Sequence, residues 1–401
     1  MSKFFTVKIY LFDTIELHEN LLPLSFTRPV ADFRCGILTI IEKWRKIVDA
    51  EVDFLPVEYL REKFGEAPDP DESALFIAGN ILPSWQLAQF AIQMTDNQRL
   101  SIKEETLIFR GCYKDFKSGI GEEVTFGDEI QRLEYVFDIF LQNGEEIKKD
   151  YKLITEGRKS RPLPACVRTL SCSDEKDSFS GEIFIEEGAV VECAAINTSQ
   201  GPVYIGKDAV LMEGACIRGP FALCEGSEVR MGAKIYEDTT VGPHCKVGGE
   251  VSNTVFFGYS NKAHDGYLGN AVIGEWCNIG AGANASNLKN DYSLIRVWNY
   301  RTKSFMRTHL QFCGLIMGDH SKVGVNCMIN TATVMGVGVN LHGAGFPRTF
   351  VPCFSEGSPT TGFSQVPFKK FIDVAERVMS RRDLAPSECD ITLLKHIYDH
   401  S

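Results

Sequence analysis

The chain has 401 residues, too many for one ordinary hydrophobic core and about right for two or three domains. Hydrophobic residues make up 44% and charged residues 24%, a composition that excludes disorder as the dominant state. A net charge of −11 repels phosphate backbones and anionic lipids, so we expect neither nucleic acid nor a membrane as a partner. The sequence has no apolar signal-peptide core and no apolar membrane-span window, which predicts a cytoplasmic location.

Thirteen cysteines raise the question of zinc or disulfides. No C-x-x-C pair occurs in the sequence, which removes the usual zinc scaffold. An odd number of cysteines in a cytoplasmic chain favours reduced thiols. We therefore assign no metal-binding residue from this pattern.

Residues 1–178 alternate between strand-like and helix-like segments. The predicted elements, in chain order, are a strand at 4–13, a helix at 36–48, a strand at 74–81 and a helix at 85–93. This alternation favours an α/β domain with a partly parallel sheet covered by helices. A polar, serine-rich stretch at 171–181 is expected to be a linker.

A six-residue period dominates the middle of the chain. Apolar residues recur at every sixth position in three runs, which are Ile205 to Val247, then Tyr267, Ile273 and Ile279, then Met317 to Leu341. This period suits neither a helix nor one long strand, but it suits short strands and turns stacked as a parallel β-helix. We assign residues 179–346 to this domain, and the pattern resembles the left-handed β-helix of the hexapeptide acyltransferases.

Two segments interrupt or follow the repeat. Residues 284–316 break the period and carry a basic cluster, which either meets the phosphates of a ligand or forms a solvated loop that balances neighbouring acids. Residues 347–401 are expected to be an extension with short helices at 367–382 and 391–400. We expect these helices to cover the open end of the β-helix.

The stretch from 261 to 287 carries the candidate chemistry. The apolar frame slips by two residues just before Tyr267, so we expect a loop there, with His264 free to leave the core. An imidazole in such a place suits a general base that takes a proton from an attacking amine or hydroxyl. Asn278 and Asn287 offer amide groups for a sugar or for a pantetheine amide.

The same stretch resembles the acetyltransferase half of the bifunctional N-acetylglucosamine-1-phosphate uridyltransferase/glucosamine-1-phosphate acetyltransferase family. The stretch follows most of that family's pattern, K-A-x-H-x-x-Y-x-G-D-A-x-I-G-x-x-x-N-I-G-A-G, with one residue missing before the histidine. The resemblance implies that His264 is the catalytic base and that Tyr267, Asn278 and Asn287 bind substrate. It also implies acetyl-CoA as acyl donor and a homotrimer with sites between neighbouring β-helices.

The match departs from the family where the sugar phosphate is held. The family's upstream Lys and Arg have no clear equivalents in this sequence. We therefore expect Lys289 and the basic insertion to bind the phosphate, or the acceptor to be a different sugar.

The N-terminal domain resembles the sugar-nucleotidyltransferase half of the same family. The stretch at 22–40, after the first predicted strand, looks like a reworked form of the motif G-x-G-T-R-x-x-x-x-x-P-K-x-L. The resemblance implies nucleotide binding by Thr27, Arg28 and Arg34 and, after the next strand, by Gly79 and Asn80. Both motif glycines are absent and Asn80 replaces the metal-binding aspartate, so Mg²⁺ is expected only if this half is active, with UTP or dTTP as donor.

These observations predict a sugar-phosphate transferase of nucleotide-sugar metabolism. The β-helix is expected to N-acetylate an amino-sugar phosphate, and the divergent N-terminal domain to transfer a nucleotidyl group to a sugar-1-phosphate. Two alternatives stay open. One is a sugar-1-phosphate uridylyl- or thymidylyltransferase whose β-helix only holds the trimer together. The other is a non-catalytic trimeric scaffold or regulatory protein that binds a sugar nucleotide.

Overall fold

The computed structural model describes residues 7–171 and 182–401, so the linker expected at 171–181 lies almost wholly outside the described residues. The chain divides into two compact units. The N-terminal unit comprises residues up to 21, 27–33 and 38–134, and the β-helix unit comprises 22–26, 34–37 and 135–401. This division differs from the boundary expected at 178, because a helix at 138–155 packs on strands of the β-helix. The three-domain division stays a prediction.

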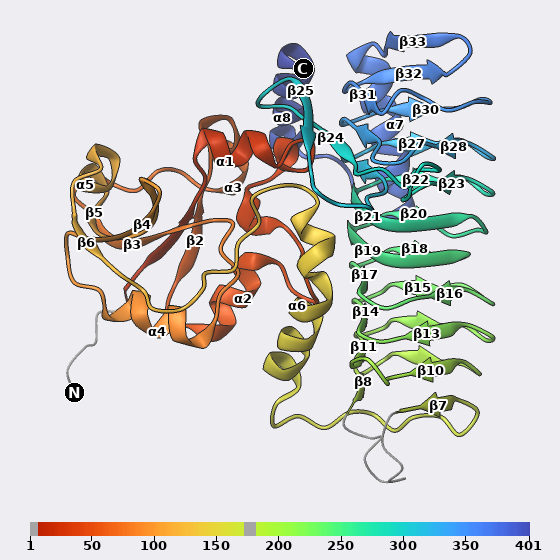
Figure 1. The fold of residues 1–401 in the computed structure, drawn as a ribbon, viewed down its shortest axis with the longest axis horizontal. Helices are drawn as coiled ribbons and strands as arrows, with labels where there is room; N and C mark the ends of the chain where they lie inside the picture. The colour runs from red at the N-terminus through yellow and green to blue at the C-terminus, as the bar shows by residue number, and fades with distance from the viewer. Residues whose placement is uncertain (1–6, 172–181) are drawn as a thin grey trace. The chain divides into compact units, whose positions relative to one another are not determined.

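The N-terminal unit is built on one six-stranded sheet (Figure 1). Its strands, in sheet order, are β2 (Val52–Leu55), β1 (Ile9–Phe12), β3 (Ser73–Ala78), β5 (Glu105–Cys112), β4 (Gln98–Ile102) and β6 (Glu122–Val124). Its helices are α1 (Ile15–Asn20), α2 (Ile40–Ile47), α3 (Arg61–Phe64), α4 (Trp85–Gln93) and α5 (Tyr113–Ser118). Strand β1 pairs in parallel with both β2 and β3, which confirms the partly parallel α/β sheet and brings three carboxyl ends to one edge.

Local sequence explains where the helix expected at 36–48 begins. Thr39 is the N-cap, since its side chain accepts from the Glu42 main-chain nitrogen while the Glu42 carboxylate accepts from the Thr39 nitrogen. This capping box satisfies two main-chain donors, so α2 begins at Ile40. The helix then buries Trp44, whose Nε1 donates to the Ile81 oxygen at 3.1 Å.

The β-helix unit stacks short parallel strands into three faces (Figure 1). Face 1 contains β7 (Arg168–Leu170), β10 (Ala195–Asn197), β13 (Cys216–Arg218), β16 (Lys234–Ile235), the first halves of β19 (Glu250–Gly258) and β21 (Tyr267–Glu275), β23 (Asn284–Ala285) and β28 (Met328–Ile329). Face 2 contains β8 (Ile183–Ile185), β11 (Val203–Ile205), β14 (Phe221–Leu223), β17 (Thr239–Val241), the second halves of β19 and β21, β26 (Ile316–Met317), β29 (Val334–Met335) and β31 (Phe350–Val351). Face 3 contains β9 (Val190–Val191), β12 (Val210–Leu211), β15 (Glu228–Val229), β18 (Lys246–Val247), β20 (Asn261–Lys262), β22 (Asn278–Ile279), β27 (Lys322–Val323), β30 (Asn340–Leu341), β32 (Ser355–Ser358) and the antiparallel β33 (Gly362–Gln365).

The apolar period fills the inside of this stack. Every apolar residue of the first and third runs lies in one continuous core, so the predicted parallel β-helix is confirmed. Three cysteines at the small positions of the repeat, Cys245, Cys277 and Cys327, are buried in the same core. All cysteines among the described residues are free thiols.

For the second run, the prediction that Tyr267 occupies an inward position of the repeat is wrong. Leu268 lies in the core, whereas Tyr267 is half-buried outside it. The register gives the reason, because Leu268 pairs with the inward Val251 and Tyr267 with Glu250. Side chains alternate along a strand, so a shift of one residue moves the tyrosine to the outer surface.

Buried serines close several turns of the β-helix. Ser260 Oγ donates to the Gly274 oxygen at 2.7 Å and accepts from the Cys277 nitrogen at 2.8 Å. One hydroxyl thus satisfies a donor and an acceptor that water cannot reach.

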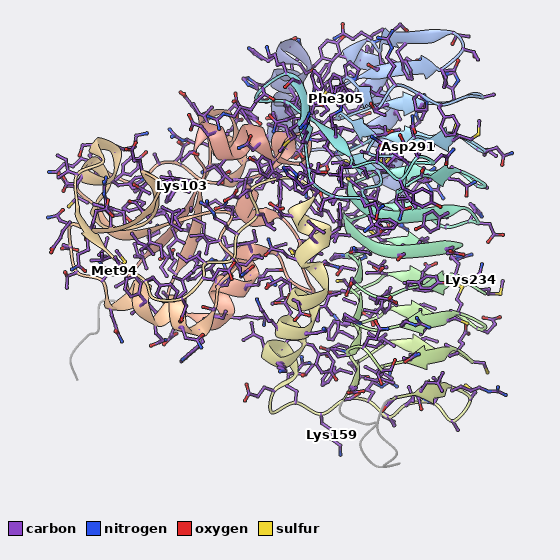
Figure 2. All side chains as sticks on the ribbon, viewed as in Figure 1. Met94, Lys103, Lys159, Lys234, Asp291 and Phe305 are labelled. Carbon is purple, nitrogen blue, oxygen red and sulfur yellow. The ribbon has the colours of Figure 1, made fainter. Side chains whose placement is uncertain are left out.

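The insertion and the C-terminal extension form their own elements. The insertion contains an antiparallel hairpin of β24 (Arg296–Asn299) and β25 (Ser304–Arg307), with Phe305 exposed on it (Figure 2). The remaining helices are α6 (Asp138–Thr155), α7 (Phe368–Met379), the 3-10 turn η5 (Ser380–Arg382) and α8 (Glu388–His400). The period break and both C-terminal helices are thereby confirmed. None of the helices in the described ranges is long and apolar enough to cross a membrane.

Candidate functional site

A cavity of about 470 Å³ lies on face 3 of the β-helix, and we call it the face-3 cavity. Four adjacent strands supply its floor through the outward residues Lys246, Asn261, Asn278 and Lys322, which the register places in one row. Parallel strands lie about 4.8 Å apart, so this row is about 14 Å long. It presents two amides in the middle and an amine at each end.

Aromatic rings and two arginines form further walls of the cavity. Tyr259 and Trp276 stack with ring centroids 4.3 Å apart, and both line the cavity. Arg381 and Arg382 line it from η5. Arg382 Nη2 donates to Asn261 Oδ1 at 3.3 Å and to the His244 main-chain oxygen at 3.1 Å. The C-terminal extension is therefore hydrogen-bonded to the floor of the cavity at Asn261.

His264 reaches the cavity from the corner between β20 and β21. The loop predicted from the frame slip is present, and Gly266 turns it with a φ of 125°. A Cβ at Gly266 would collide with the Ala283 oxygen, so only glycine fits this corner. The imidazole is exposed, and no side chain in the described part of the chain hydrogen-bonds to it. It is therefore open to a ligand.

Lys262 braces the same corner from inside the β-helix. It occupies the inward position that Val247 occupies in the preceding coil, and it is 1% exposed. Its Nζ donates to the His264 main-chain oxygen at 2.6 Å. Burial lowers the pKa of Lys262 to about 8, although the nearby Asp265 carboxylate opposes this shift. The buried amine thus fixes the backbone that carries the imidazole.

Tyr267 and Asn287 contact each other on face 1 rather than the face-3 cavity. Asn287 Nδ2 donates to Tyr267 Oη at 2.9 Å and to Asn270 Oδ1 at 2.7 Å. Burial raises the pKa of Tyr267. The predicted acetyltransferase residues therefore fall into two groups, with His264 and Asn278 in the cavity and the Tyr267–Asn287 pair beyond the corner.

Lys289 is engaged within its own loop. Its Nζ donates to Ser293 Oγ at 3.4 Å and to the Leu294 oxygen at 3.1 Å. Its expected role in binding a sugar phosphate stays a prediction.

The carboxyl edge of the N-terminal sheet carries a second group of residues. Gly79 and Asn80 directly follow β3, and Asp13 directly follows β1. Asp13 Oδ2 accepts from the Val30 nitrogen at 3.0 Å. A Cβ at Gly79 would lie 2.7 Å from Asp13 Oδ1, so glycine lets the carboxylate sit on this strand end. Burial raises the pKa of Asp13 to about 7, although the hydrogen bond from Val30 opposes the shift.

Two side-chain oxygens at this edge are candidate ligands for the expected Mg²⁺. Asp13 Oδ1 and Asn80 Oδ1 are buried and lack hydrogen-bond partners among the described residues. A carboxylate and an amide oxygen are ligands that Mg²⁺ accepts while it keeps water and phosphate in its other positions. The donor set fits the ion, with Asp13 supplying the carboxylate that Asn80 lacks. No group of three or more His, Cys, Asp or Glu residues within 7–171 and 182–401 could hold a metal.

The other predicted nucleotide-binding residues lie in different units. Thr27 and Arg28 are buried in the N-terminal unit. Arg34 belongs to the β-helix unit, where its Nε donates to the Phe257 oxygen at 3.3 Å and its Nη1 donates to the Ile37 oxygen. The nucleotide-binding role of all three stays a prediction.

Sequence reasoning missed several residues of these two sites, among them Asp13, Lys262, Lys322, Arg381 and Arg382. A signal existed for some of them. A lysine at an inward position of the repeat is unusual, and an aspartate that directly follows a buried strand lies at a sheet edge. The arginines end an amphipathic helix, and only the packing of that helix brings them to the cavity.

Comparisons with known proteins find matches over part of the chain. Residues 9–159 match a family model described as sugar nucleotidyl transferase. The bifunctional protein GlmU of Trichodesmium erythraeum is 32% identical over 111 residues, which cover 27% of this chain and 20% of that protein. These partial matches support a divergent likeness to GlmU. The GlmU of Gloeobacter violaceus is 31% identical over 115 residues, 28% of this chain and 21% of its own.

The aligned part of this GlmU-like chain spans about a fifth of the length of those two relatives. Among solved structures, AntD, an N-acyltransferase from Bacillus cereus, aligns with 50% of this chain and 89% of its own at 12% identity and a TM-score of 0.18.

Proposed function

We propose that this GlmU-like protein is a transferase of sugar-nucleotide metabolism, and that its β-helix unit moves an acetyl group from acetyl-CoA to an amino-sugar phosphate. The observation that carries the proposal is the exposed imidazole of His264 on a cavity lined by amides and cations. A general base needs access to the proton that it removes, and no neighbouring side chain competes for this imidazole within the described residues.

In the proposed reaction His264 takes one proton from the acceptor amine while the nitrogen attacks the thioester carbonyl carbon. The N–C bond forms and the C–S bond breaks, and the electron pair leaves with the sulfur. The proton held by His264 then passes to that sulfur, so the products are the amide and the free thiol. Asn261 and Asn278 bind the polar groups of the ligands, and Lys262 positions His264 through its main-chain oxygen.

We propose nucleotidyl transfer to a sugar-1-phosphate as the activity of the N-terminal unit. The family match over residues 9–159 supports it, as do the two unpartnered oxygens at the sheet edge. Asp13 and Asn80 would hold Mg²⁺, which neutralises phosphate charge when bound. Thr27 and Arg28 are proposed to bind the phosphates of UTP or dTTP. A homotrimer, in which neighbouring chains could complete the Tyr267 and Asn287 group, belongs to the same proposal.

The test of acyl transfer is CoA release from acetyl-CoA with glucosamine-1-phosphate and related amino sugars, measured by mass spectrometry. We expect acceptor-dependent acetylation that falls at least about a hundredfold in His264→Ala, the range typical of a lost general base. His342→Ala removes an exposed imidazole outside the cavity and should leave the rate unchanged. Acetylation that survives in His264→Ala would refute the assigned base.

Nucleotidyl transfer is tested separately by release of pyrophosphate from UTP or dTTP with sugar-1-phosphates. We expect Mg²⁺-dependent release that is lost in Asp13→Asn. No release with either nucleotide would leave acyl transfer as the activity of this protein and would overturn the proposal for the N-terminal unit.

A further inference from the structure

The face-3 cavity is strongly cationic. Its lining includes four cationic side chains and no carboxylate, the cations being Lys246, Lys322, Arg381 and Arg382. The whole chain carries a net charge of −11, so this cluster is opposite in sign to the protein around it. A cavity with one sign of charge concentrates ligands of the opposite sign.

Lys322 makes hydrogen bonds but no ion pair among the described residues. Its Nζ donates to the Trp276 and His320 main-chain oxygens, each at 2.8 Å. Burial lowers the pKa of Lys322 to about 8, even though Asp319 acts to raise it. Lys322 is half-buried, and keeping an ammonium there costs free energy unless an anion compensates it. Lys246, at the other end of the row, forms an ion pair with Glu228, and its Nζ lies 2.6 Å from Glu228 Oε1.

The two arginines come to the cavity through the docking of α7. The helix buries Phe371, whose ring lies edge-on to Phe354 at 4.9 Å and to His320 at 5.8 Å. This contact holds the end of α7 and η5 against the upper coils. Arg382 uses Nη2 for its bonds to the His244 main-chain oxygen and to Asn261 Oδ1, and no hydrogen bond within the described residues engages its Nε or Nη1. Arg381 is exposed and makes no ion pair in the described chain.

We propose that the face-3 cavity binds the diphosphate of a nucleoside-diphosphate ligand, and that Arg381 and Arg382 are its phosphate-binding residues. Guanidinium groups bind phosphate oxygens in pairs and do so better than ammonium groups. Coenzyme A and a nucleotide sugar both carry such a diphosphate. The proposal rests on the proposed function only in placing the reaction at His264.

The amides of the floor fit the remainder of either ligand. Asn261 and Asn278 lie between the two amines, and His264 lines the same cavity. A ligand held by its diphosphate at the arginines can extend along the row of about 14 Å, which follows from the spacing of parallel strands. Its reacting end then approaches the imidazole.

The experiment is calorimetric titration of the full chain with coenzyme A, with UDP-N-acetylglucosamine and with pantetheine, which lacks phosphate. We expect one or both diphosphates to bind and pantetheine to bind at least about tenfold more weakly, the loss typical of a charge-assisted hydrogen bond. Arg381→Gln and Arg382→Gln should each weaken the diphosphate by a similar factor, and Arg382→Lys by less. Arg377→Gln is the matched control, because Arg377 is exposed on α7 outside the cavity.

Each outcome bears on a different claim. Equal affinity of Arg381→Gln, Arg382→Gln and the natural chain would overturn the inference, and so would equal affinity for coenzyme A and pantetheine or no binding of either diphosphate. Binding of coenzyme A that depends on the arginines, without acetyl transfer to any amino sugar, would support the inference and refute the proposed acyl transfer. Arginine-dependent binding of the nucleotide sugar alone would assign the cavity to that ligand. An unchanged urea midpoint in both glutamine variants would exclude loss of the fold as the cause.

Discussion

Replacing Lys262 by methionine tests the buried amine at the corner of the site. Lys262 is 1% exposed and its pKa is lowered from 10.5 to about 8. Between these two values the unfolded chain still holds a proton that the folded chain has released, so folding becomes more favourable as pH rises. A shift of this size makes the natural chain gain about 2 kcal/mol of unfolding free energy, relative to Lys262→Met, between about pH 7 and about pH 9.5.

The assay is urea unfolding at both pH values, followed by tryptophan fluorescence, to which Trp276 and Trp298 report from the β-helix unit. The difference between the two proteins isolates Lys262, because all other titrating groups are common to both. Lys234→Met is the control, since Lys234 is exposed on face 1 (Figure 2), and its difference from the natural chain should not change with pH. A difference that stays flat in Lys262→Met would show that the amine is not buried in the core and would refute the register at β20.

Three further changes test the packing and the sheet edge. Ser260→Ala leaves a buried oxygen of Gly274 and a buried nitrogen of Cys277 unpaired, and should lower the unfolding free energy by about 2–3 kcal/mol in urea titrations; a loss below about 0.5 kcal/mol would contradict the bridging role. Gly242→Ala places a methyl group against main-chain oxygens of β19 and should cost about 2 kcal/mol or more, measured in the same way, whereas no loss would mean that the coils separate easily. The pKa of Asp13 is raised from 3.8 to about 7. Between these two values the folded chain holds a proton that the unfolded chain has released, so folding of the natural chain becomes less favourable as pH rises. The unfolding free energy of Asp13→Asn should therefore gain about 2.5 kcal/mol relative to the natural chain between about pH 5 and about pH 8. A constant difference over that range would show that the carboxyl is not buried in the fold.

The fold could be predicted wherever one period dominates. The six-residue repeat gave the β-helix and most of its core, because every inward position must be apolar or small to fill the stack. It failed at Tyr267 and Leu268, where the long strand β21 turns the corner between faces and alternation replaces the period. The repeat marks Lys262 only as an unusual inward lysine, and the structure shows why it is tolerated there, since its amine donates a hydrogen bond to a main-chain oxygen.

The residues of the candidate site likewise include some that the local repeat predicts and others that only long-range packing brings together. The sequence by itself determined that His264 and Asn278 lie on adjacent coils, because parallel stacking places residues one coil apart next to each other. It could not determine that Arg381 and Arg382 face them, because more than a hundred residues separate these arginines from His264 in the chain. Only the packing of Phe371 against the upper coils brings η5 to the cavity. Local patterns fix the strands and turns, whereas the charge of the cavity depends on long-range apolar contacts that no local pattern encodes.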